Sequence, residues 1–555
     1  MQDPLLTNRD GNAGADTAVR EATVVRGANL ITKIEETVSI PSCSNLVLTW
    51  IARGSNLALA GPFIEHSVDV VRALFSKHGE SPIASMDISR DLFHHTSQPI
   101  DTENAETLQS LQAQFGHQRC RWEVLGFFFT AAARAAIEMA KFESDRGLRD
   151  FQRIFMNLSD LILDIALSLD CLNDLQLLLQ YENWLVHSHV DGDQSYYSWK
   201  RLGDVVSSMY ALGYHQQADG DTDANPSFLL ELRRLAVATT FSADKNVSIF
   251  LGRPPRMPRK YCKFILPRSS EVLGASTITT WENDVEFDYI TDIRWASLCA
   301  ILKEDILDLS SSADINDNHP KVRDIRATAH SQWQAFPARF RLESSLKQCS
   351  QQPVVRDFML NSRLNQLHVI FLLRMAVSRS RPDADSELVS TSAAILSLIV
   401  EAIMQKDYLV NSGTSLVWKV AYYGMSAAGV ICMWLLNQSS RAQHSDIDMS
   451  KVFQNLSVLV AEMDTGVLIE TDDPNYKLLV DASKTIGCLL SRLLHGRLSI
   501  QNSRQLTSPT SSSTMLDSGD FQGWNAWDGH TLQDFESDFW LNLAEHPFLA
   551  GAQDL

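Results

Sequence analysis

The side chains best suited to chemistry are concentrated in one short stretch, His187-Ser188-His189-Val190-Asp191-Gly192-Asp193. Two imidazoles at positions 187 and 189, followed closely by carboxylates, are the ligand types that hold zinc and related metals in hydrolytic enzymes. The stretch therefore raises one concrete hypothesis about chemistry, a metal-dependent hydrolytic centre.

The residues around this stretch argue against that hypothesis. The stretch resembles the His-x-His-x-Asp-His loop of metallo-β-lactamase-like hydrolases, which requires a preceding strand, a final histidine and further ligands on later strands. Here residues 173–187 have a helical pattern, Gly192 occupies the place of the last histidine, and the following residues are helical again. A motif without its structural context rarely has the chemistry. We therefore expect a polar loop between two helices.

No other motif supplies a catalytic or metal centre. The closest two of the eight cysteines, Cys262 and Cys299, are 37 positions apart, and no Cys-x-x-Cys pair occurs. Zinc modules need ligands that short loops bring together, so none is predicted. Phosphate-binding loops, dinucleotide-binding glycine motifs and nucleophile elbows are also missing from the sequence. We therefore assign no catalytic, metal-binding or cofactor-binding residue and no cofactor, and we predict that the protein is not an enzyme.

Composition limits the partners. The 555 residues are 45% hydrophobic and 21% charged, which is ordinary for a globular protein with a large core, and the formal charge is −19. An acidic chain repels the phosphate backbone, so a broad nucleic-acid-binding surface is not expected. The strongest basic run contains Arg253, Arg256, Arg259, Lys260 and Lys263. A phosphate or nuclear-import contact and a solvated loop beside the acidic residues 217–223 both fit this run.

Helical periodicity extends through most of the chain, and no segment alternates cleanly with a period of two. We therefore predict an all-α fold. Residues 42–59 are apolar and fit either a strand or a helix. The predicted helices cover residues 62–77, 121–142, 148–169, 173–187, 282–309, 358–379, 415–437, 452–463 and 476–494.

The segment 415–437 is long and apolar enough to span a bilayer. Lys419 lies inside it, however, and no second segment of this kind accompanies it. We interpret it as a buried core helix and expect no membrane association.

The two ends of the chain differ from the helical middle. Residues 1–40 are rich in Asn, Asp, Gly, Ala and Thr, and we expect a mobile, disordered segment there. Residues 499–520 are rich in Ser, Thr and Gln, a composition typical of linkers.

Residues 196–267 form the most distinctive part of the helical middle. Gly213 follows an apolar helical face and is a suitable C-cap, because glycine adopts the left-handed conformation without a side-chain clash. A second helical segment then ends at Gly252 and Pro254, since proline lacks the amide donor that a helix needs. The face of the first helix consists of Trp199, Leu202, Val205, Val206, Met209 and Leu212.

The amino-acid sequence of this hairpin resembles the middle homology region of fungal zinc-cluster transcription factors. The residues that carry the resemblance are Trp199, Gly203, Leu212-Gly213-Tyr214-His215, Glu231, Arg233, Arg234, Asp244 and Gly252-Arg253-Pro254. One departure is the replacement of the usual aromatic pair after the arginines by Leu235-Ala236-Val237. From the chain itself, the default roles of Arg233, Arg234 and Asp244 are ion pairs and caps within the domain.

The resemblance implies a large multi-helix regulatory domain over residues 41–498, with 196–267 as its signature. The family places six closely spaced cysteines with two zinc ions before this domain, whereas the first 119 residues here contain only Cys43. Consequently no DNA-binding residue is identifiable, and direct DNA binding is not predicted.

The C-terminal tail, residues 521–555, is an acidic-aromatic segment without Lys or Arg. Acidic residues keep aromatic side chains solvated in a disordered chain until a partner's groove binds them. Phe535, Phe539 and Leu543, with Trp540 beside them, would share one face if the segment folded as a helix on binding. This composition is typical of a transcriptional activation segment. The alternative is a tail that docks onto its own domain.

Together these features predict a nuclear transcription regulator of a fungal metabolic or secondary-metabolite gene cluster. Its partners would be a coactivator or the transcriptional machinery, bound through the tail, with homodimerisation or a DNA-bound partner factor left open. Its helical body would respond to a ligand or partner by exposing or masking residues 517–555. The alternatives are a helical enzyme of secondary metabolism with an unrecognised active site and a membrane-associated protein.

Overall fold

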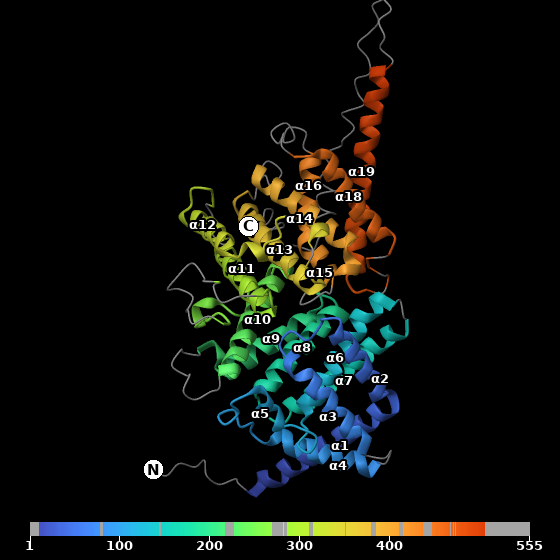
Figure 1. Cartoon of the computed structure of the whole chain (residues 1–555), viewed down its shortest axis with the longest axis vertical. Coiled ribbons are helices and arrows are strands. Elements are labelled where there is room, and N and C mark those ends of the chain that lie inside the picture. Colours follow the sequence, from blue (N-terminus) through green and yellow to red (C-terminus); the bar gives the residue numbers. More distant parts are fainter. Residues whose placement is uncertain are drawn as a thin grey trace, which may run out of the picture.

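The computed structural model describes residues 10–505 except 78–81, 144–145, 217–226, 269–280, 282–285, 310–314, 350, 379–384, 410–414, 437–446, 467, 470 and 472. Every regular element in these residues is a helix, which confirms the predicted all-α fold (Figure 1). The order of the helices along the chain follows the long axis of the molecule, from α1 at one end to α19 at the other.

The first half of the chain forms one end of the molecule around the central helix α6 (Figure 1). Helix α6 is rich in alanine and phenylalanine, and its side chains from Trp122 to Ala136 are buried all round. A helix that is apolar on every side must lie inside the core. The helices of this half are α1 (Asp10–Thr37), α2 (Ile40–Ala52), α3 (Ile64–Lys77), α4 (Pro82–Ser97), α5 (Leu108–Ala113), α6 (Trp122–Glu143), α7 (Arg146–Leu167) and α8 (Asp174–Val190).

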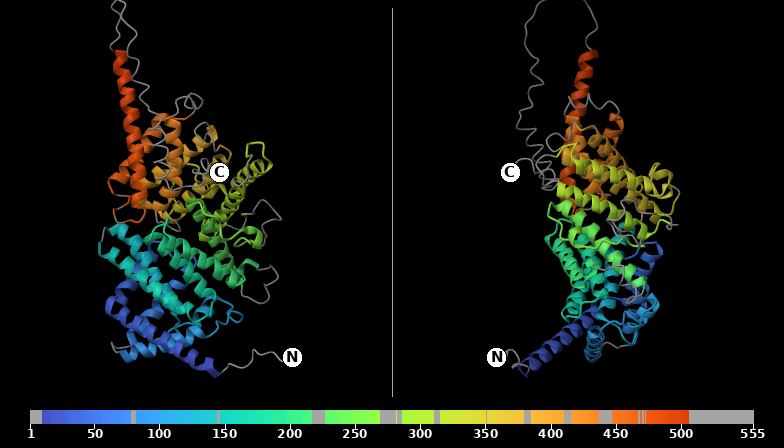
Figure 2. Two further views of the ribbon diagram at one scale, coloured as in Figure 1. Left: turned by 180° about the vertical axis from the view of Figure 1, so that it is seen from behind. Right: turned by 90° about the vertical axis from the view of Figure 1, so that its left-hand side faces the viewer.

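The second half continues as helices that pack on one another in sequence, α10 on α11, α11 on α13, α13 on α14 and α14 on α16. Helices α18 and α19 form a pair beside α14 and α16, and the end of α19 extends beyond the other helices (Figure 2). The helices are α9 (Tyr196–Ala211), α10 (Ser227–Leu251), α11 (Tyr289–Leu309), α12 (Pro320–Ala335), α13 (Pro353–Val377), α14 (Ser386–Met404), α15 (Leu416–Lys419), α16 (Met425–Leu436), α18 (Met449–Asp464) and α19 (Tyr476–Gln505).

Short polar side chains set several helix starts. Asn173 accepts a hydrogen bond from the Gln176 amide at the start of α8, and Asp385 accepts one from the Leu388 amide at the start of α14. These side chains replace the helical acceptors that first-turn amides lack. At the other end of α9, Gly213 has a φ of 74°, which confirms its predicted role as the residue that ends this helix.

The expectation of a mobile segment over residues 1–40 is wrong for most of its length. Residues 10–37 form α1, which packs against α4 and α7, and Ile31 and Ile34 are fully buried. The composition is polar on average, but Val24, Ile31 and Ile34 recur at helical spacing and form an apolar stripe. Residues 1–9 lie outside the described residues.

The structure resolves one open expectation and corrects another. The apolar segment 42–59, which fitted either a strand or a helix, is helical up to Ala52 as part of α2. The predicted linker over 499–520 begins later than expected, because α19 continues to Gln505. The remainder of that linker lies outside the described residues.

Two helices among the described residues are long and apolar enough to cross a membrane by length and composition, Ser386–Met404 and Leu416–Leu436, so the expectation that no second such segment accompanies 415–437 is wrong. The second contains a π-helical turn at Val420–Gly424, and 89% of its most apolar 18-residue stretch is buried inside the protein. Its one charged residue, Lys419, forms a buried ion pair of 2.8 Å with Asp357. The packing of this helix agrees with the predicted core helix.

Candidate ligand-binding cavity

The stretch that first suggested metal chemistry begins inside a helix. His187, Ser188 and His189 lie in the last turns of α8, and Asp191 is its C-cap. Gly192 follows with a φ of 93°, and a Cβ atom there would lie 2.9 Å from Pro474. The predicted helix before the stretch and the helix after it are confirmed, although the polar loop is shorter than expected.

His187 is held on both ring nitrogens by carboxylates. Its Nε2 lies 2.8 Å from Asp160 Oδ1 and its Nδ1 lies 2.5 Å from Asp191 Oδ2. Arg201 also contacts Asp160, at 3.0 Å. Burial lowers the pKa of His187, but the hydrogen bonds to the two carboxylates outweigh it and raise the pKa above its usual value. Both ring nitrogens of His187 are therefore occupied by structural contacts. Among the described residues, no three or more His, Cys, Asp or Glu side chains are placed so that they could hold a metal ion.

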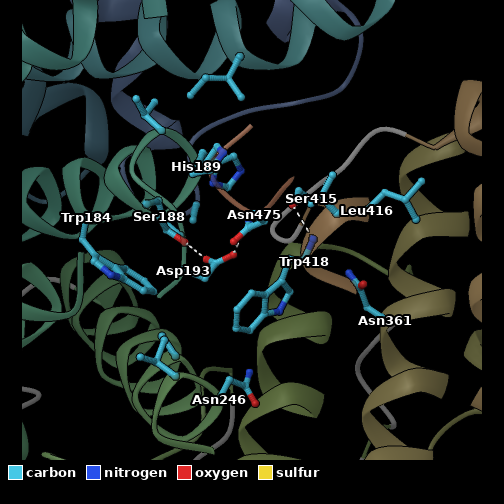
Figure 3. A pocket seen from close by; sticks show the side chains of 18 of the residues that line it. Trp184, Ser188, His189, Asp193, Asn246, Asn361, Ser415, Leu416, Trp418 and Asn475 are labelled. Carbon is cyan, nitrogen blue, oxygen red and sulfur yellow. Dashed lines mark hydrogen bonds between the residues drawn. The ribbon is translucent and has the colours of Figure 1, made fainter. Parts of the chain in front are cut away.

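The other half of the stretch connects distant parts of the chain. Ser188 donates a hydrogen bond to Asp193, whose second oxygen accepts one of 3.2 Å from Asn475 Nδ2. Burial raises the pKa of Asp193 to about 7. Asn475 immediately precedes α19, so this cluster joins the end of α8 to the C-terminal helices (Figure 3).

This cluster forms one wall of a cavity of about 500 Å³ between the two halves of the molecule. Trp184 and His189 lie on the same side as the cluster, Asn361 and Leu416 lie on the opposite side, and Trp418 is between them (Figure 3). Such a volume is within the range of pockets for small organic ligands. The apolar and aromatic part of the lining includes Ala58, Ile137, Tyr181, Trp184, Leu185, Val247, Tyr289, Ile293, Ala296, Leu416, Val417 and Trp418.

A buried lysine organises the polar part of the lining. Lys303 Nζ donates hydrogen bonds of 2.9 Å to the side-chain oxygens of Asn246 and Asn365. The Tyr422 hydroxyl donates to the same Asn246 oxygen and the Tyr423 hydroxyl to the same Asn365 oxygen, each at 3.2 Å. An ammonium group has only donors, so it requires the carbonyl oxygen of each amide to face it.

The two asparagines therefore present their amide nitrogens away from the lysine. Both residues line the cavity, and neither side-chain nitrogen has a hydrogen-bond acceptor among the described residues. Burial lowers the pKa of Lys303 to about 8. The lysine forms no ion pair with a described carboxylate, so amide oxygens and two tyrosine rings surround its charge.

Asp292 is the second unusual ionisable residue of the cavity. It lies in the first turn of α11 and lines the cavity, and its carboxyl group makes no hydrogen bond or ion pair with the described residues. Burial raises the pKa of Asp292 to about 8, and the nearby charge of Asp357 acts in the same direction. A partly desolvated carboxyl without a partner inside a cavity is a candidate ligand-binding group.

The signature residues of the hairpin form a structural clamp. The Arg253 and Arg256 guanidinium groups stack on the ring of Trp199, at 4.5 and 3.5 Å from its centre. Gly203 allows this approach, because a Cβ atom there would lie 3.0 Å from the Arg256 guanidinium. Asp244 accepts hydrogen bonds of 3.0 Å from the backbone amides of Arg256 and Met257. The proline turn is thus bound to both helices of the hairpin.

The remaining signature charges are also paired inside the domain. Arg233 donates two hydrogen bonds to Asp174, at 2.7 and 2.9 Å, and Arg234 lies 4.0 Å from Glu231. The expectation of ion pairs and caps for Arg233, Arg234 and Asp244 is therefore confirmed.

The basic run is only partly available to a partner. Arg259 forms an ion pair of 2.8 Å with Asp305, and Arg253 and Arg256 contact Trp199 as described above. The acidic residues 217–223, expected beside this run, lie outside the described residues. So do the tail candidates Phe535, Phe539, Trp540 and Leu543, about which the structure gives no information.

Sequence reasoning missed the cavity. Asn246, Asp292 and Asn365 line the cavity from α10, α11 and α13, and Lys303 is buried beside the two asparagines. The sequence signal that could have indicated a site is a charged or amide side chain on the buried face of a helix. Lys303, which lies among the buried apolar residues of 298–309, is an example. That signal marks single residues but cannot tell which of them meet.

In comparisons with known proteins, no family model matches this chain, and no curated protein or solved structure matches it. The resemblance carried by the signature residues therefore stays a prediction.

Proposed function

We propose that this protein is a nuclear transcription regulator of a fungal metabolic or secondary-metabolite gene cluster. Its helical body binds a small-molecule effector in the cavity between its halves, and its acidic-aromatic tail contacts a coactivator. DNA is reached through a partner factor or a second DNA-bound protein. It acts by binding and not by catalysis.

The observation that carries the proposal is the double role of α10. One face of this helix holds Asp244, which binds the proline turn of the signature hairpin. Another face lines the cavity through Thr239 and Asn246. A ligand in the cavity therefore contacts the same rigid helix that anchors the signature segment. A ligand can shift a protein between states only through contacts that differ between them, and α10 offers such contacts.

The test of the tail uses a fusion of residues 499–555 to an unrelated DNA-binding domain, with reporter expression as the readout. We expect activation well above the bare domain. The matched control replaces Phe535, Phe539, Trp540 and Leu543 by alanine and keeps every acidic residue, and it should lose most of the activation because the hydrophobic anchors are gone. Equal activity of the two fusions at equal expression would reject an aromatic activation segment.

Nuclear localisation and regulation are tested on the whole chain. A fluorescent fusion of the full-length protein should accumulate in the nucleus, and deletion of its gene should change transcripts of a limited gene set. Unchanged transcripts under conditions in which the protein is expressed would contradict the proposal.

Asp292 supports a second candidate, an enzyme that uses the cavity as its active site. A carboxyl whose pKa is raised to about 8 can donate or accept a proton near neutral pH. Incubation of the purified protein with a metabolite extract, followed by mass spectrometry, compares the wild type with Asp292→Asn. Conversion of any metabolite by the wild type alone would favour this candidate over a regulator.

A further inference from the structure

The cavity carries two separate polar recognition points. One is the pair of amide nitrogens of Asn246 and Asn365, whose oxygens are both held by Lys303. The other is the unpartnered carboxyl of Asp292. The first point offers only hydrogen-bond donors, and the second offers a carboxyl group that can donate when protonated and accept in either state.

The spacing of the two points follows from α11. Asp292 and Lys303 are eleven residues apart, which places them on the same face of the helix about 16 Å apart along its axis. The lysine side chain extends back towards the start of the helix, so the separation of the two recognition points is on the order of 10 Å. Ala296 lines the cavity one turn after Asp292, so α11 presents a small side chain at that position between the two points.

The walls favour a flat, apolar middle section in the ligand. Trp184 and Trp418 line the cavity, and the Trp418 ring stacks on the Tyr422 ring with 4.9 Å between centroids. Aromatic rings supply a large contact area and prefer aromatic partners. The Trp418 orientation is fixed from behind by Phe250, whose ring centroid is 5.0 Å away.

Around these two recognition points the environment disfavours a charged ligand group, although charged side chains such as Arg149, Arg153 and Lys406 line other parts of the cavity. Lys303 is already surrounded by two amide oxygens and two tyrosine rings, so it does not require an anion. Burial and the neighbouring Asp357 favour the neutral form of Asp292 and outweigh the opposing charge of Lys419. Removing a charged ligand group from water would cost free energy, and neither of the two points provides an interaction that offsets this cost.

We propose that the cavity binds an elongated, uncharged aromatic molecule with a carbonyl group at one end and a hydroxyl group at the other. The carbonyl oxygen accepts hydrogen bonds from the Asn246 and Asn365 amides, and the hydroxyl group bonds to Asp292. The inference deepens the proposed function, because its biological meaning rests on the cavity being the effector site.

The test uses a matched set of biphenyls and measures dissociation constants with the full-length protein by calorimetry. The probe 4-acetyl-4′-hydroxybiphenyl has both groups, 4-acetylbiphenyl lacks the hydroxyl, and 4-hydroxybiphenyl lacks the carbonyl. Two charged analogues replace the hydroxyl by an aminomethyl group or the acetyl by a carboxylate. We expect the first probe to bind most tightly. Loss of either group should weaken binding roughly 3- to 30-fold, as expected for one or two hydrogen bonds to otherwise unpaired groups.

Three variants connect this preference to the residues. Asn246→Asp and Asn365→Asp keep an oxygen for Lys303 but remove the amide donor from the cavity, so each should abolish most of the preference for the acetyl group. Asp292→Asn keeps a neutral side chain that can donate and accept, so it should retain the preference for the hydroxyl probe. Circular dichroism and thermal midpoints show whether each variant is folded.

Several outcomes would overturn the inference. Tighter binding of the aminomethyl analogue, lost in Asp292→Asn, would make the cavity a cation site. Tighter binding of the carboxylate analogue would make Lys303 an anion receptor. Equal affinities for all probes, or no binding at 1 mM, would reject directed recognition of this class. Probe binding is measured without transcription, so a failed reporter assay with intact probe binding would reject the proposed function alone.

Discussion

Asp292, which is half-buried, and Lys303, which is buried, lie on one face of α11, and their pKa values are shifted towards each other. Burial raises the pKa of Asp292 to about 8 and lowers that of Lys303 to about 8. Each side chain is therefore disfavoured in its charged form where the protein holds it. Residues of this kind are retained at functional sites more often than in inert cores, and both of these adjoin the cavity.

The first prediction concerns Asp292→Asn and stability. The pKa of Asp292 in the folded protein lies above its value in an unfolded chain, about 3.9. The wild type therefore loses stability at this site as pH rises from about 4 through about 8, whereas asparagine does not titrate. Urea midpoints at pH 5 and pH 8 should show that the variant gains stability over the wild type as pH rises. A stability difference between variant and wild type that is the same at both pH values, or that moves against the variant as pH rises, would contradict this.

The second prediction concerns His187. Because Asp160 and Asp191 raise its pKa in the folded state, the stabilisation by this cluster is fully present below the unfolded value of about 6.5. It declines as pH rises through the higher folded pKa. We expect His187→Gln to be more destabilising at pH 5.5 than at pH 8.5, by thermal midpoints in both buffers. His94→Gln, at an exposed position of α4, is the control and should show no such difference.

At the scale of elements, α6 and α8 illustrate how close packing depends on a single glycine. A Cβ atom at Gly126 would overlap the Leu179 side chain, which is fully buried in the core. Helix α19 contains Gly487 in a different situation, because a Cβ atom there would lie 3.6 Å from Val460 in ordinary contact. The two helical glycines therefore differ in how closely a neighbouring side chain approaches the position of a Cβ atom.

The third prediction follows from this contrast. Gly126→Ala should destabilise the protein by about 1–3 kcal/mol, since overpacking a tight core forces side chains off their rotamers. Gly487→Ala should be neutral or stabilising by up to about 1 kcal/mol, because alanine is the better helix former. Denaturation midpoints of the two variants measured side by side test both signs. Equal effects would mean that the α6–α8 contact is looser than the structure shows.

The signature hairpin is an element whose sequence pattern now has a physical reason. The Arg256 guanidinium stacks on the indole ring of Trp199. Gly203 belongs to the pattern because a side chain there would collide with that guanidinium. Asp244 then closes the turn by accepting two backbone amides. These contacts stabilise a rigid exit from α10, so the motif marks a fold feature and assigns no chemistry by itself.

At the scale of the whole molecule, the cavity lies where the N-terminal and C-terminal halves meet, and its lining residues lie between Ala58 and Asn475. The fourth prediction is that removal of residues 521–555 changes the affinity for 4-acetyl-4′-hydroxybiphenyl by less than twofold while reporter activation is lost. The physical reason is that every lining residue found in the described part of the chain lies between Ala58 and Asn475. Tighter probe binding after the deletion would instead indicate that the tail docks onto its own domain over the cavity.

Much of the fold was predictable from the sequence, because helix formation is encoded over short distances. The apolar stripes at three- and four-residue spacing correctly identified α3, α6, α7, α8 and the hairpin. The failure at residues 10–37 came from averaging composition over a segment in which Val24, Ile31 and Ile34 already formed a stripe. Gly213 was identified correctly, since only a glycine tolerates the left-handed residue at that helix end without cost.

The sequence by itself determined the helical class and most of the long helices, because helix formation depends on neighbours within a few turns. It also indicated structural roles for Arg233 and Asp244, but only the tertiary structure identified the partner of Arg233 as Asp174, 59 positions away. Only the tertiary structure decided the candidate site. Asn246, Asp292 and Asn365 come from three different helices, and whether a polar residue meets a cavity depends on where the packing of α8, α10, α11 and α13 leaves space. It likewise decided that His187 is bound by Asp160, 27 positions away, and thus that the most reactive-looking stretch is part of the scaffold.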